Sequence, residues 1–161
     1  MKKRFQSHKN KFLFGSTSAI ITNLALVVGL ETSINAKLNI VASILVIAVA
    51  DNISDTLGIH IYQEAEGLKG KEVWLYSITN FIARLLVSII FILLVILLPL
   101  PIAVISSIIF GLLILAIISY IIARHNKMNP YRAIIDHIII ALLVVLTSNF
   151  LGNWIVNELH Y

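Results

Sequence analysis

Two aspartates are the residues most able to do chemistry in this chain, because each lies inside an otherwise apolar stretch. Asp51 and Asp55 interrupt the segment Leu38–Tyr62. Their spacing of four places both on one face of a helix. If that helix crosses a membrane, each carboxylate costs about 2.5–3.5 kcal/mol at mid-depth, so neither is expected to face lipid.

Two carboxylates one turn apart repel each other when both are ionised. One of them then holds a proton, unless a cation lies between them. Hard oxygen ligands suit magnesium, manganese or ferrous ions better than soft metals. The pair therefore predicts a divalent cation site, a proton relay, or both.

Arg84 offers a second explanation for the same two acids. It is the only cation well inside an apolar stretch, and it shares a helical face with Asn80 and Ser88 at intervals of four. A pair between Arg84 and the aspartates would neutralise them without any transport role. Both interpretations stay open from the residues alone.

Further polar residues are weaker candidates. Ser18 and Thr22 form a small polar face on the first apolar stretch, and Ser54 lies beside the aspartates. Such faces pack helices closely and can also line a pore. Asn23 is costlier to bury and is the better candidate ligand. Glu64, Glu66 and Glu72 share a loop with two lysines, for which a solvated linker is favoured over a metal-gathering loop.

The composition of the chain places these residues in a membrane. Of its 161 residues, 59% are apolar and 12% are charged, and the mean hydropathy is +0.96. Soluble domains carry about 25% charged residues. This composition excludes a soluble enzyme, a disordered tail and a nucleic-acid-binding domain, despite an isoelectric point near 9.5. Without cysteine there is no thiolate chemistry, and without a nucleotide-binding loop the chain alone is no primary pump.

The apolar stretches predict an all-α membrane protein of one domain over residues 1–161. A span needs about 20 mostly apolar residues, and helices satisfy their own backbone groups in lipid. The expected transmembrane helices are residues 12–30, 38–62, 74–98, 102–123 and 133–157. Between the third and the fourth, Pro99-Leu100-Pro101 indicates a tight reversal, because proline ends helices.

Basic residues predict the orientation of the five helices. In a five-span arrangement ten lysines and arginines fall on one side, and only Lys37 falls on the other. The positive-inside tendency then makes the N-terminus cytoplasmic and the C-terminus outside or lumenal. The first apolar stretch carries several polar residues and lacks a good cleavage site, which favours a retained span over a signal peptide.

Two runs of residues resemble the first two helices of the vacuolar iron transporter family. They are GSTSAIITNLALVVG, from Gly15 to Gly29, and ILVIAVADNISDTLG, from Ile44 to Gly58. Gly15, Thr22 and Gly29 fall in register with the family's first-helix pattern. Ala50, Asp51, Ser54 and Gly58 match its second, and LPLP before the fourth helix is similar to the family's PLLP.

The resemblance implies a five-helix secondary transporter and no enzyme. Its members move iron or manganese away from the cytoplasm in exchange for protons, as dimers whose first helices line the pathway. The implied partners are the metal ion, protons, the lipid bilayer and a second copy, with no resident cofactor and no nucleic acid. Asp51 is implied as metal ligand or proton acceptor, and Ser18, Thr22 and Ser54 as lining positions. The expected location is the inner membrane of a prokaryote, or a vacuolar-type membrane in a eukaryote.

The departures from the family pattern fall at the chemistry. Ser18 stands where the family has a metal-binding aspartate, Asp55 where it has methionine, and His60 where it has tyrosine. A carboxylate is thus lost from one helix and gained on the next, which favours harder ions. The loop from Gln63 to Val73 is short and holds only three glutamates. The other class that remains open is a non-transporting membrane protein of the same fold, with Asp51 and Asp55 neutralised by Arg84.

Overall fold

The computed structural model describes residues 2–68 and 70–158, and for residues 2–12 and 14 it describes the backbone only. The described chain consists of five helices without a strand. They are α1 (Lys2–Gly29), α2 (Ala36–Ala65), α3 (Lys71–Leu97), α4 (Leu100–His125) and α5 (Pro130–Glu158). The expectation of an all-α chain of five helices is confirmed.

Short connections with specific turn residues join these helices. Asn35 takes a left-handed conformation (φ 56°) before α2, and Gly67 and Gly70 have φ values of 83° and 61° between α2 and α3. Pro99 lies between α3 and α4, as its inability to continue a helix predicts. The Asn129 side chain accepts a hydrogen bond from the backbone N–H of Tyr131 at 3.0 Å and so caps the start of α5.

Helix α1 begins about ten residues before the predicted span, at Lys2 rather than at residue 12. A span is limited by the thickness of the bilayer, whereas a helix can continue into water through lysine, arginine and glutamine, which are good helix formers. The other four helices each extend one to three residues beyond most predicted limits, and α3 ends one residue early. Boundary differences of this size are common for helices.

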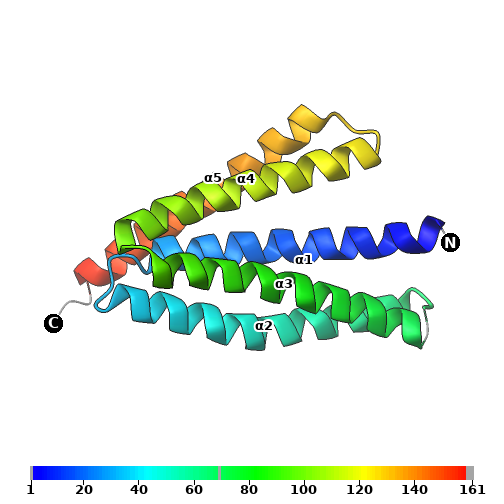
Figure 1. Ribbon diagram of the computed structural model, residues 1–161, viewed down its shortest axis with the longest axis horizontal. Helices are drawn as coiled ribbons and strands as arrows, with labels where there is room; N and C mark the ends of the chain where they lie inside the picture. The colour runs from blue at the N-terminus through cyan, green and yellow to red at the C-terminus, as the bar shows by residue number, and fades with distance from the viewer. Residues whose placement is uncertain (1, 69, 159–161) are drawn as a thin grey trace.

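Helix α1 lies between two pairs of helices (Figure 1). Helix α3 packs against both α1 and α2, and α4 and α5 form a hairpin that packs against the other side of α1. Helices α1 and α2 pack little against each other. Helix α1 begins at the same end as the α2–α3 and α4–α5 connections, and α5 ends at the opposite end (Figure 1).

Four helices, α2 to α5, are long and apolar enough to cross a membrane. In α1 the apolar helix within the described residues is Gly15–Gly29. Large apolar side chains also lie on the outside of the bundle, including Leu97 at 73% exposed and Phe150 at 67%. An outer surface of this kind is compatible with an integral multi-pass membrane protein. The basic leader and Lys69, on which part of the predicted orientation depends, lie outside the described side chains.

The apolar core includes Ile20 and Leu24 of α1, Ile44 of α2 and Phe91 of α3, all completely buried. Close approaches between helices occur at glycines. A Cβ on Gly152 of α5 would lie 2.0 Å from the carbonyl oxygen of Gly29 in α1, and a Cβ on Gly15 would lie 2.6 Å from Oδ1 of Asn80. These contacts hold α1 against α5 at one end and against α3 nearer the other.

Candidate functional site

Helix α3 carries a stripe of buried polar side chains. Asn80, Arg84 and Ser88 recur at intervals of four, so they share one helical face, and they are 0%, 3% and 4% exposed. The stripe lies where α3 is covered by α1 and α2. An arginine buried this deeply requires acceptors for its N–H groups.

Arg84 finds those acceptors on both neighbouring helices. Its Nη2 donates to Oδ2 of Asp51, and its Nη1 donates to Oδ2 of Asp55 and, at 2.6 Å, to Oγ of Ser18. One guanidinium therefore links α1, α2 and α3. We call Ser18, Asp51, Asp55 and Arg84 the charge cluster.

The carboxylates in the charge cluster are more accessible than the guanidinium. The Arg84 side chain is 4% exposed, whereas those of Asp51 and Asp55 are 44% and 39% exposed. The Nη1 atom of Arg84 that binds Asp55 also binds Ser18 of α1, so this part of the cluster lies on the side of α2 toward α1. Helices α1 and α2 pack little against each other. The cluster is thus capped by Arg84 on one side but is not sealed within this chain.

The formal charges in the cluster do not cancel. Two carboxylates and one guanidinium leave one negative charge when all three groups are ionised. In the interior of a membrane an uncompensated charge is expensive, so a further proton or cation is expected beside the carboxylates. Chemically, the cluster can bind a proton, or it can exchange Arg84 for another cation.

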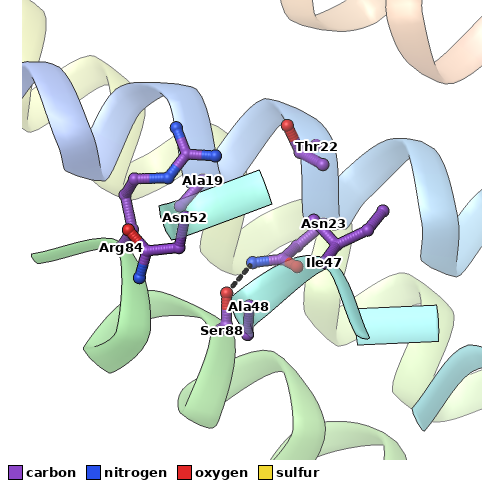
Figure 2. Close-up of a pocket in the computed structure, with 8 residues that line it drawn as sticks. All are labelled: Ala19, Thr22, Asn23, Ile47, Ala48, Asn52, Arg84 and Ser88. Carbon is purple, nitrogen blue, oxygen red and sulfur yellow. Dashed lines mark hydrogen bonds between the residues drawn. The ribbon is translucent and has the colours of Figure 1, made fainter. Parts of the chain in front are cut away.

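A second polar group lies next to Arg84, between the same three helices (Figure 2). Asn23 of α1, which is 1% exposed, donates from Nδ2 to Oγ of Ser88 at 3.0 Å. Asn52 of α2, which is fully buried, donates from Nδ2 to the carbonyl oxygen of Phe81 at 3.0 Å. Thr22 lines the same small space. Of the predicted ligands, Asn23 therefore acts as a donor to α3.

Several buried polar atoms of α2 and α3 have no hydrogen-bond partner within the described part of the chain. They are Oδ1 of Asn52, Oγ1 of Thr56 and both amide atoms of Asn80. Native proteins leave few such atoms, and those that occur often mark sites of function or bound water. All three residues belong to α2 or α3, the helices that also carry Asp51, Asp55 and Arg84.

The remaining predicted candidates are not gathered into the cluster. Ser54 is exposed on α2. Glu64 lies 3.5 Å from Nε2 of His60, and among the described residues no three histidine, cysteine or acidic side chains come together in a way that could hold a metal ion. Glu64, Glu66 and Glu72 therefore form no three-carboxylate site within this chain. His60 lies against α3, with its ring 4.8 Å from that of Trp74 and Nδ1 3.3 Å from Ser77 Oγ.

Asn52 is the site residue that the sequence-based prediction missed. The prediction singled out its neighbour Asp51 because burying a charge is costly, and it passed over Asn52 because burying an amide costs less. The signal was present nonetheless, because a carboxamide in the middle of an apolar stretch also needs partners. The angle between residues 51 and 52 on a helix is about 100°, so the two side chains point differently: Asn52 reaches the backbone of Phe81, and Asp51 reaches the end of the Arg84 side chain.

Searches for similar proteins gave no match to this chain, whether among family models, curated proteins or solved structures. The resemblance to the vacuolar iron transporters consequently stays a prediction from Gly15–Gly29 and Ile44–Gly58. Any function must be supported by the charge cluster itself.

Proposed function

We propose that this protein is a proton-coupled secondary transporter that moves a divalent metal ion, iron or manganese, out of the cytoplasm. The observation that carries the proposal is the charge cluster. Two carboxylates share one guanidinium on helices long enough to cross a membrane, with one negative charge in excess. Such a site calls for a compensating cation.

Charge balance suggests how the exchange works. In one state Arg84 and a single proton together balance Asp51 and Asp55. In the other state a divalent ion replaces the proton beside both carboxylates and Arg84 moves aside, so the site with Arg84 then carries one positive charge. The oxygen atoms of Asp51, Asp55 and Ser18 are hard ligands suited to manganese or ferrous ions. Metal and proton thus compete for the same two side chains, which couples their movements.

The proposal includes five spans with a cytoplasmic N-terminus, and it includes a homodimer. The half-exposed carboxylates lie on the side of α2 toward α1. A second copy covering that side would remove the carboxylates from lipid and would supply each acid twice, as expected of a two-fold symmetric pathway. Ser54 and Thr22 would then face the same route.

A specific observation favours a second candidate, a non-transporting membrane protein. Arg84 contacts both acids at once, which is the arrangement expected of a fixed structural ion pair. In that case the carboxylates orient α2 relative to α3, and the excess charge is removed by permanent protonation. The two candidates differ in whether Arg84 ever leaves the carboxylates.

Metal uptake by proteoliposomes separates the two candidates. We expect the parent chain to accumulate manganese against a proton gradient, with matching proton counterflow reported by a trapped pH dye. Asp51→Asn and Asp55→Asn should each abolish uptake, because either variant leaves too little charge to hold a divalent ion. Asp136→Asn is the matched control, since Asp136 is an exposed acid 4.0 Å from Arg132 on α5.

Each other outcome has a defined meaning. If both aspartate variants transport like the parent, the site assignment is wrong. If the parent moves neither manganese nor iron under any proton gradient, the non-transporting candidate holds. Uptake of another ion that requires the same two aspartates would keep the transporter and change its cargo.

A further inference from the structure

A small, partly open cavity lies beside Arg84, between α1, α2 and α3 (Figure 2). The volume in which the centre of a water molecule can lie is about 10 Å³. That is close to the minimum that holds a single water molecule. The polar residues that line it are Thr22, Asn23, Asn52, Arg84 and Ser88.

Asn52 supplies an acceptor that no described residue satisfies. Its Oδ1 is buried without a partner, while its Nδ2 donates to the carbonyl oxygen of Phe81 at 3.0 Å. Exchanging the two amide atoms would set oxygen against oxygen, so the hydrogen bond to Phe81 fixes the orientation of the amide. The oxygen must therefore receive its hydrogen bond from something other than the described chain.

The opposite side of the cavity offers a complementary group. Oγ of Ser88 accepts the hydrogen bond from Asn23, and its hydroxyl proton can be donated. A cation is a poor occupant, because Arg84, whose side chain is positively charged, is one of the residues that line the same space. An organic ligand is too large. A water molecule, which both donates and accepts, matches the size and the chemistry.

We propose that this cavity binds one ordered water molecule, which donates to Oδ1 of Asn52 and is held by Ser88 and Arg84. This water also has a second role, which rests on the proposed transport function. When a proton or metal ion takes a carboxylate from Arg84, the freed N–H group needs a new acceptor, and the water provides it. The site thereby lowers the cost of releasing Arg84.

Radiolytic labelling in ¹⁸O water tests the binding site on the full chain in detergent. Ile47 lines the cavity, whereas Ile44 is completely buried one turn earlier and serves as the control of the same residue type. We expect Ile47 to gain label several-fold faster than Ile44. Asn52→Leu, which removes the amide, and Ala48→Val, which fills the cavity, should each reduce labelling of Ile47 to the rate set by its outer surface alone.

Two results would overturn the water site. One is equal labelling of Ile47 and Ile44 in the parent. The other is labelling of Ile47 that neither substitution changes, because the label would then come from the outer surface of the half-buried side chain. Exposed Met128 should label equally in every variant and controls for the radical dose, and continued protection of the completely buried Ile44 reports that each variant is folded.

Manganese binding, followed by loss of the free-ion electron paramagnetic resonance signal, tests the role at Arg84. Asn52→Leu should weaken binding several-fold, because release of Arg84 becomes costlier and the binding-competent state is less populated. Asn153→Leu, which removes a half-buried amide on α5, should bind like the parent. Unchanged binding in Asn52→Leu would overturn the role at Arg84. Absence of any manganese binding in the parent would instead count against the proposed cargo, and the labelling result would stand by itself.

Discussion

The three helices α1, α2 and α3 and the α4–α5 hairpin use buried polar groups in different ways. Between α1, α2 and α3, the buried Arg84 binds two aspartates and Ser18, and the same helices bury three asparagines, Asn23, Asn52 and Asn80. The described buried residues of α4 are apolar apart from Ser107, Gly111 and Ser119, and those of α5 are Ala141 and Gly152. The difference separates a region built around charge from one built on close packing.

This contrast indicates where a functional change would be felt. Polar contacts among α1, α2 and α3 are interdependent, because the guanidinium of Arg84 on α3 forms hydrogen bonds to side chains of both α1 and α2. The hairpin is attached by the approach of Gly152 to Gly29 and by isolated hydrogen bonds, such as Asn149 Nδ2 to Glu31 Oε1 at 2.9 Å. Matched substitutions in the two regions should therefore differ in size.

The largest expected effect follows from removing the guanidinium. Arg84→Met leaves two carboxylates without their partner, and breaking a buried ion pair costs about 3–5 kcal/mol. The free energy of unfolding, from denaturant titration in detergent followed by tryptophan fluorescence, should fall by up to that amount, because the carboxylates left unpaired are 44% and 39% exposed. Adding Asp51→Asn and Asp55→Asn should restore most of it.

The matched control for this substitution is Arg132→Met in α5. The Arg132 side chain is 84% exposed and lies 4.0 Å from Asp136. Exposed pairs contribute about 0–1 kcal/mol, so little change is expected. Equal losses in Arg84→Met and Arg132→Met would remove the distinction between the two regions.

A smaller effect is expected where the hairpin meets α1. Gly152→Ala places a Cβ 2.0 Å from the carbonyl oxygen of Gly29, so the backbones must separate. Overpacking of this kind costs about 1–3 kcal/mol in the free energy of unfolding. Gly58→Ala on α2 is the control, because a Cβ there meets nothing within 4 Å. It should be neutral or gain up to about 1 kcal/mol from helix propensity. A loss at Gly58 as large as that at Gly152 would contradict the close approach.

The smallest effects come from one hydrogen bond in each region. Ser88→Ala removes the acceptor of the buried Asn23 amide and should cost about 1–2 kcal/mol, because a buried donor is left unpaired. Ser119→Ala removes the 2.7 Å contact with His137 and should cost about 0.6 kcal/mol, the average for such bonds between membrane helices. The same unfolding measurement compares both. A reversed order would mean that the hairpin, and not α3, depends on its polar contacts.

Much of the fold follows from patterns along the chain. Apolar stretches near span length predicted five helices, and the Pro99-Leu100-Pro101 turn predicted the reversal after α3. The interval of four predicted that Asn80, Arg84 and Ser88 share a face, and all three are buried. The first helix begins ten residues before the predicted stretch, because hydropathy detects the apolar part of a helix and not its polar extension.

The candidate site was predictable only in part. The cost of burying charge singled out Asp51, Asp55 and Arg84, and pairing between them was one of two interpretations. Asn52 was missed, and nothing in the spacing of residues within one helix could indicate that Asn23 would meet Ser88, 65 positions away. Contacts of this kind depend on the rotation and depth of one helix against another.

The amino-acid sequence by itself determined that this chain forms apolar helices and that a few costly polar groups point inward, because both depend on local period and transfer free energy. The tertiary structure decided that Arg84 reaches both carboxylates and Ser18 at once, and that the carboxylates remain partly open. Those facts depend on which helices are neighbours. Side chains along the length of α3 fit closely against α1 and α2, whereas α1 and α2 pack little against each other. This fit along whole helices decides which helices are neighbours.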